Sequence, residues 1–76
     1  MEIARLISIN PDIHHGTPVI TGTRVPVSII VGSLAGGMSK EDVCTEYGVS
    51  KDAIDAALEY AAELIRVTEA TSLASD

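Results

Sequence analysis

Aromatic side chains and cysteines are nearly absent from this sequence of 76 residues. There are two tyrosines, Tyr47 and Tyr60, and neither phenylalanine nor tryptophan. Small-molecule pockets are lined largely by apolar and aromatic side chains, so we expect closely packed helices and neither a small-molecule substrate nor a cofactor. The single cysteine, Cys44, cannot form an internal disulfide, which agrees with a reducing compartment.

Long apolar runs are also missing. No stretch approaches the ~20 apolar residues that cross a bilayer, although 46% of the residues are hydrophobic. The first residues lack the charged start, apolar run and cleavage site of a secretory signal. We therefore expect a cytoplasmic protein that does not bind a membrane. A chain this short forms one domain and buries only about 60% of its unfolded surface, so self-association is expected.

Basic residues are scarce. Lysine and arginine together number five against eleven acidic residues, which gives a net charge of −6. Residues 1–38 are neutral, and residues 39–76 carry the whole −6. Most sequence-independent affinity for DNA comes from basic side chains against phosphates. Any binding of operator DNA should therefore be weak, whereas the acidic half suits a basic protein partner.

Short β-favouring segments and turns occupy the first third of the chain. Residues 5–9 predict a strand, which ends where Pro11 removes a ladder donor. Residues 18–20 and 24–25 predict a small hairpin around Gly22, which supplies the positive φ of the turn.

Three helices are predicted after this β element. Pro26 and the glycines at 36–37 bound the first helix, over residues 27–35. Ser39 caps a second helix that runs to Tyr47, and Ser50 caps a third over residues 51–67. We expect residues 68–76 to form a frayed tail. The predicted fold is therefore a single, mainly α domain over residues 1–67, with three helices in a helix-turn-helix-like arrangement after a short N-terminal β hairpin element.

The second and third helices follow the spacing of a helix-turn-helix. Two helices that cross steeply need a small side chain at their closest approach and a residue that tolerates positive φ at the turn. The residues that fit this pattern are Val43, Cys44, Tyr47, Gly48, Val49, Ile54 and Ala57. The spacing is informative about the fold and says little about DNA binding.

Several short motifs together resemble a known bacterial family. They are Asn10-Pro11-Asp12-Ile13, Gly16, Pro18-Val19-Ile20, Gly22-Thr23-Arg24, Pro26-Val27, Leu34-Ala35, Gly37, Ser39 and Tyr47. On these motifs the chain resembles the domain-of-unknown-function family 433. The resemblance implies a small helix-turn-helix-like fold and a role as the presumed antitoxin beside a toxin with a PIN-like nuclease fold.

Catalytic and metal-binding chemistry is not indicated. His14 and His15 are adjacent, so in an extended segment they point to opposite faces, and no third ligand stands at a suitable spacing. Cys44 has acidic neighbours and no general base. We therefore expect neither an enzyme nor a metal site.

Arg24 stands out because it directly follows the turn of the predicted hairpin. Its guanidinium can clamp a carboxylate or phosphate of a partner, or an acidic group of its own domain, and the sequence does not separate these roles.

Two functions fit the sequence. The first is the antitoxin of a type II toxin-antitoxin pair that binds and restrains a PIN-like nuclease toxin; the alternative is a DNA-binding transcriptional regulator that acts as a dimer. The candidate nucleic-acid or partner contacts are Arg5, Arg24, Lys40 and Lys51. The apolar residues of the third helix span an arc too wide for the core of so small a chain to cover. We therefore expect a second copy to cover the rest, as a homodimer. The candidate dimer or partner contacts are Leu58, Tyr60, Leu64, Ile65 and Val67.

Overall fold

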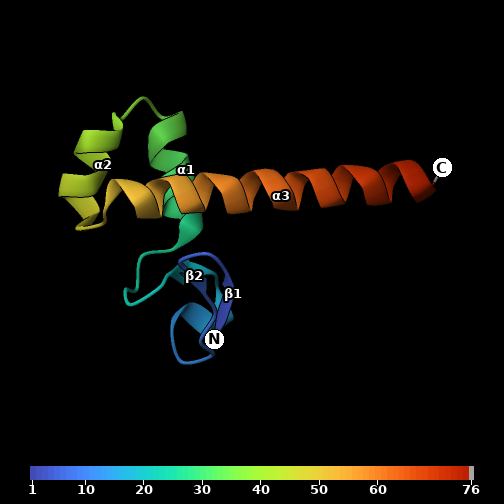
Figure 1. Cartoon of the computed structure of the whole chain (residues 1–76), viewed down its shortest axis with the longest axis horizontal. Helices are drawn as coiled ribbons and strands as arrows, with labels where there is room; N and C mark the ends of the chain where they lie inside the picture. Colours follow the sequence, from blue (N-terminus) through green and yellow to red (C-terminus); the bar gives the residue numbers. More distant parts are fainter. Residues whose placement is uncertain (76) are drawn as a thin grey trace.

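The structure, a computed structural model, describes the backbone of residues 1–75 and the side-chain environment of residues 1–69. It has a small N-terminal sheet followed by three helices, α1 (Val27–Ala35), α2 (Lys40–Tyr47) and α3 (Lys51–Ser75). Both α1 and α2 cross the first half of α3, as Figure 1 shows, and the sheet lies at one end of α1. The mainly α fold predicted from the sequence is confirmed.

The sheet is antiparallel, with the strand order β1 (Glu2–Ala4), β2 (Ile7–Ser8), β3 (Val19–Ile20). The prediction of one strand over residues 5–9 is confirmed only for Ile7–Ser8, because Arg5 and Leu6 form the turn between β1 and β2. Leu6 adopts φ 60°, a left-handed conformation that its side chain does not favour and that the sequence therefore did not indicate.

The predicted hairpin around Gly22 is present in reduced form. Only β3 is a strand, and an isolated bridge joins Val19 to Pro26 across the turn. The Ile20 amide donates to the Val25 carbonyl at 3.0 Å, and Gly22 has the predicted positive φ, at 81°. A one-turn 3₁₀ helix, η1 (His14–Gly16), precedes this region and was not predicted.

Local capping fixes both ends of α2 and the start of α3. Ser39 accepts a hydrogen bond from the Asp42 amide at 3.1 Å, as the capping-box pattern predicted. Gly48 ends α2 in the left-handed conformation at φ 66°. Ser50 then accepts from the Ala53 amide at 3.1 Å at the start of α3. These two helices and the turn between them form the helix-turn-helix-like unit.

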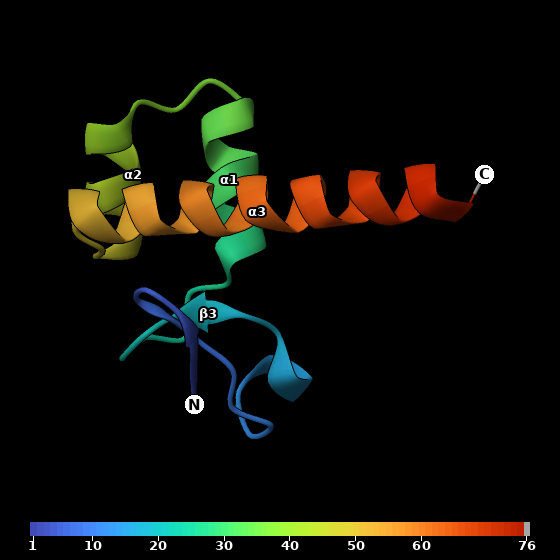
Figure 2. The ribbon, with the colours of Figure 1, turned by 45° about the vertical axis from the view of Figure 1, so that its right-hand side comes forward.

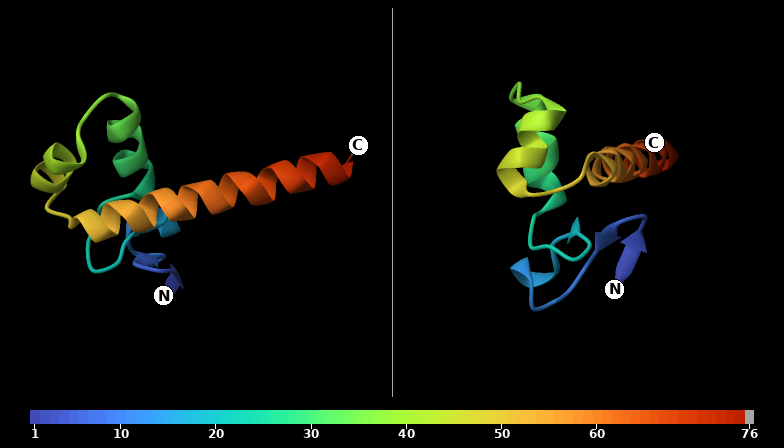
Figure 3. Two further views of the ribbon diagram at one scale, coloured as in Figure 1. Left: turned by 45° about the horizontal axis from the view of Figure 1, so that its top comes forward. Right: turned by 60° about the vertical axis from the view of Figure 1, so that its left-hand side comes forward.

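Helix α3 is longer than predicted. The sequence indicated an end near Val67 and a frayed tail over residues 68–76, whereas the backbone is helical through Ser75, and Asp76 lies outside the described residues. The added segment contains neither proline nor glycine, so nothing in it interrupts the helix. The second half of α3 extends beyond α1 and the sheet, which Figure 2 and the left view of Figure 3 show from two further sides.

The core lies where α1, α2 and the sheet meet the first half of α3. Its fully enclosed side chains come from every layer: Ile7 on β2, Ile30 on α1, Val43 on α2 and Ile54 on α3. Ala53 and Ala57 are also buried, and such small side chains let the helices approach closely. The right-hand view of Figure 3 shows α1 and α2 on one side of α3.

Candidate interaction surface

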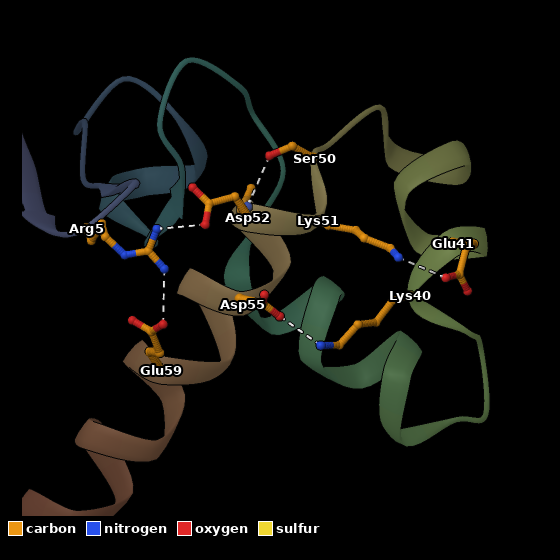
Figure 4. Close-up of polar contacts among 9 residues, drawn as sticks. Arg5, Lys40, Glu41, Ser50, Lys51, Asp52, Asp55 and Glu59 are labelled. Carbon is orange, nitrogen blue, oxygen red and sulfur yellow. Dashed lines mark hydrogen bonds and ion pairs between the residues drawn. The ribbon is translucent and has the colours of Figure 1, made fainter.

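Arg5 is held by the first half of α3. Its guanidinium donates from Nη1 to Asp52 Oδ1 and from Nη2 to Glu59 Oε1, each at 3.0 Å (Figure 4). The turn between β1 and β2 presents Arg5 to α3, so the turn that the sequence failed to predict also creates this contact. Both hydrogen bonds raise the pKa of Arg5 above its ordinary value.

The two lysines of the helix-turn-helix-like unit are also paired. Lys40 Nζ lies 2.8 Å from Asp55 Oδ1, and Lys51 Nζ lies 3.1 Å from Glu41 Oε1, so the pairs cross between α2 and α3 in both directions (Figure 4). The hydrogen bond from Lys40 holds the pKa of Asp55 below its usual value, and that from Lys51 does the same for Glu41. Such exposed pairs add little stability, but each one neutralises a lysine that could otherwise bind a phosphate of DNA.

Arg24 differs from the other basic residues. Its side chain is exposed and makes no ion pair with any residue that the structure describes. Its main-chain oxygen lies 3.0 Å from Nε2 of His14, which thereby ties η1 to the turn after β3. The structure therefore does not bring the four predicted basic contacts together. Arg5 and Lys40 pair with carboxylates of α3, Lys51 pairs with a carboxylate of α2, and Arg24 lies near the sheet without an ion pair among the described residues.

The five predicted apolar contacts divide into two groups along α3. Leu58 and Tyr60 are half-buried against the core. Leu64, Ile65 and Val67 are 54%, 58% and 49% exposed, because α3 has by then passed beyond the rest of the domain. The prediction that the apolar arc of this helix exceeds what the core covers is confirmed at Leu64 and Ile65.

A shallow apolar groove of about 280 Å³ borders the exposed part of α3. No charged side chain lines it, and its walls come from the segment before β3, from α1 and from α3: Thr17, Pro18, Val27, Ser28, Val31, Tyr60, Ala61 and Leu64. The sequence indicated Tyr60 and Leu64 only. The sequence did not indicate the other lining residues, because they come together only when the segment before β3 packs beside α1.

The described residues contain no group of three or more His, Cys, Asp or Glu side chains that could hold a metal ion. His14 and His15 are both exposed and both have positive φ, at 49° and 56°. None of the described helices is long and apolar enough to span a membrane. Cys44 is half-buried against the core as a free thiol.

Several bacterial proteins are similar to this chain over part of their length. An uncharacterised protein of Sinorhizobium fredii, y4eO, is 50% identical over 36 residues, which are 47% of this chain and 16% of that protein. An uncharacterised protein of Mycobacterium tuberculosis, Rv2308, is 37% identical over 54 residues, which are 71% of this chain and 23% of that protein.

A solved structure shares the fold. The crystal structure of Rv2018 from Mycobacterium tuberculosis matches 68% of this chain with a TM-score of 0.64 and 33% sequence identity, and the match covers 24% of that chain. The chain thus spans less than a quarter of the length of each of these relatives. Residues 7–61 match the family described as a protein of unknown function, DUF433, and the chain therefore belongs to that family.

Proposed function

We propose that this chain is the antitoxin of a type II toxin-antitoxin pair and that it binds and restrains a PIN-like nuclease toxin. The observation that carries the proposal is the exposure of Leu64, Ile65 and Val67 together on the protruding half of α3. Large apolar side chains gathered on one exposed element are typical of a protein-protein contact. The role that the family resemblance implies supports the same conclusion.

The charge of the chain fits a basic partner. Five carboxylates make no ion pair in the described part of the chain: Glu2, Asp12, Asp42, Glu46 and Glu69. These carboxylates contribute to the net charge of −6, which attracts a basic protein and speeds the encounter of the two. Burial of Ile65 then slows dissociation, because mutations within an interface act mainly on the rate of dissociation.

DNA binding as a regulator is the second candidate, favoured by the helix-turn-helix-like arrangement of α2 and α3. The start of α3 is a poor reader of DNA, because Lys51 is paired with Glu41 and stands beside Asp52. Repulsion between these carboxylates and phosphates opposes binding. Arg24 is the base that remains available, so a dimer would contact few phosphates and its affinity would depend only weakly on salt.

Co-expression tests the antitoxin proposal. A PIN-like nuclease encoded beside this gene is expressed alone, with the chain, and with the Ile65→Asp variant. We expect the nuclease alone to arrest growth, the chain to restore growth and co-purify with the nuclease, and Ile65→Asp to do neither.

A matched control is Ile29→Asp, since Ile29 is 44% exposed but lies on α1 and does not line the groove beside α3. It should restore growth as the unaltered chain does. A nuclease that is harmless alone, or that remains toxic and unbound beside the chain, contradicts the proposal. Retarded migration of the operator DNA with the chain alone would then favour the regulator.

A further inference from the structure

The apolar stripe by which α3 packs on α1 continues beyond the domain. Ala57 is buried, Ala61 is half-buried and Leu64 is 54% exposed, and steps of three and four residues keep them on one side of the helix. The exposure of the stripe rises along the helix because α3 extends beyond the place where α1 crosses it, as Figure 1 shows. An isolated helical segment shorter than about 12–15 residues is marginal in water, so contact with another surface would stabilise the protruding half.

The groove described above adjoins this stripe on the same molecule. Leu64 and Ala61 form one wall, and Val27 and Val31 of α1 form the facing one. Thr17, Ser28 and Tyr60 are the polar residues among its lining, which contains no acidic or basic side chain. Each copy of the chain therefore presents both an uncovered apolar helix and an uncovered apolar groove beside it.

We propose that the groove is covered by a second copy of this chain, with the two α3 helices antiparallel and a two-fold axis near Leu64. In this arrangement each copy places its protruding half over the groove of the other, and the two Leu64 side chains meet near the axis. Ala61 is small enough to let the helices approach closely. The same patch is used on both copies, so the assembly closes as a dimer.

Both copies are acidic, so this contact depends on where the charged side chains lie on α3, and they leave the face around Leu64 apolar. At 100° per residue, Glu59 and Arg66 lie about 140° and about 160° around the helix from Leu64, on the side away from the groove. Arg66 is also paired with Glu63. Glu69, which has no ion pair among the described residues, lies about 140° from Leu64 and so also on the far side of the helix. Ile65 lies about 100° from Leu64 and stays at the edge of the contact, available to a different protein.

The mass of the purified chain, measured by light scattering at micromolar concentrations, tests the dimer without any nuclease. We expect twice the monomer mass of 7.9 kDa for the unaltered chain. Leu64→Glu and Ser28→Glu should each raise the dimer dissociation constant by about 100-fold or more, because each forces a carboxylate into an apolar contact. Ile29→Glu adds the same charge outside the groove and should leave the dimer intact.

Both Leu64 and Ser28 are exposed, so these substitutions leave the core unchanged, and a helical circular dichroism spectrum confirms that each variant is folded. Oxidation tests whether the two copies meet at Leu64: Leu64→Cys should form a disulfide-linked dimer, whereas the parent chain, with Cys44 alone, should not. A monomeric mass for the folded parent chain overturns the proposal. A dimer that survives both Leu64→Glu and Ser28→Glu, or that Ile29→Glu disrupts equally, overturns it as well.

Discussion

Two isoleucines on α3 allow folding and binding to be separated. Ile54 is fully buried in the core, and Ile65, three turns further on, is 58% exposed. Replacing Ile54 by alanine deletes three carbon atoms, worth about 2.4 kcal/mol at about 0.8 kcal/mol each. The cavity left behind brings the loss to about 2–5 kcal/mol. A chain of this length has a total stability of about 4–11 kcal/mol, so Ile54→Ala should remove a large part of the free energy of unfolding.

The same substitution at Ile65 should have little effect on folding. More than half of its surface already meets water, so the loss is about 1 kcal/mol at most, and the higher helix propensity of alanine offsets part of it. Ile65→Ala should nevertheless weaken binding of the nuclease. The free energy of unfolding is measured in urea by circular dichroism at one protein concentration, because a dimer gains stability with concentration. Equal destabilisation by the two substitutions would show that residue 65 belongs to the folded body and would refute this reasoning.

Four further substitutions test the local structure. Gly48→Ala should lower the free energy of unfolding by about 1 kcal/mol, because Gly48 has φ 66°. Gly32→Ala inside α1 should raise it by up to ~1 kcal/mol, because a methyl group there meets open space. The midpoints of urea unfolding measure both effects. Ser39→Ala removes the cap of α2 and should cost about 1 kcal/mol, also measured in urea. The pKa of Asp55 is lowered by its hydrogen bond from Lys40, so this pair stabilises the fold above the unfolded pKa and the benefit is lost as pH falls below about 4. Asp55→Asn should therefore flatten the dependence of the melting temperature on pH in that range.

The features that the sequence predicted best are those set by local chemistry. Pro26 and the glycine at position 36 bound α1 at the predicted residues, Val27–Ala35. Ser39 and Gly48 mark the ends of α2 in the same way, since a cap and a left-handed turn each depend on one residue and its near neighbours. The helix-turn-helix-like unit follows directly from these signals.

The features that the sequence did not predict depend on distant residues. Arg5 and Glu59 are 54 positions apart, and nothing in either segment indicates that they meet. The groove likewise forms only because Pro18 lies beside α1. The path of the chain after η1 places it there, and the local sequence does not indicate that path. Arg24 was singled out from its place in the turn, and its exposure without an ion pair among the described residues emerged only from the fold.

Inhibition of the nuclease is the most direct measurement of the central claim. The purified PIN-like nuclease encoded beside this gene is assayed on RNA while the chain is titrated in. We expect cleavage to stop at a fixed stoichiometric ratio, Ile29→Ala to inhibit equally well, and Ile65→Ala to require an excess because its complex dissociates faster. Cleavage that continues unchanged in the presence of excess folded chain would contradict the account.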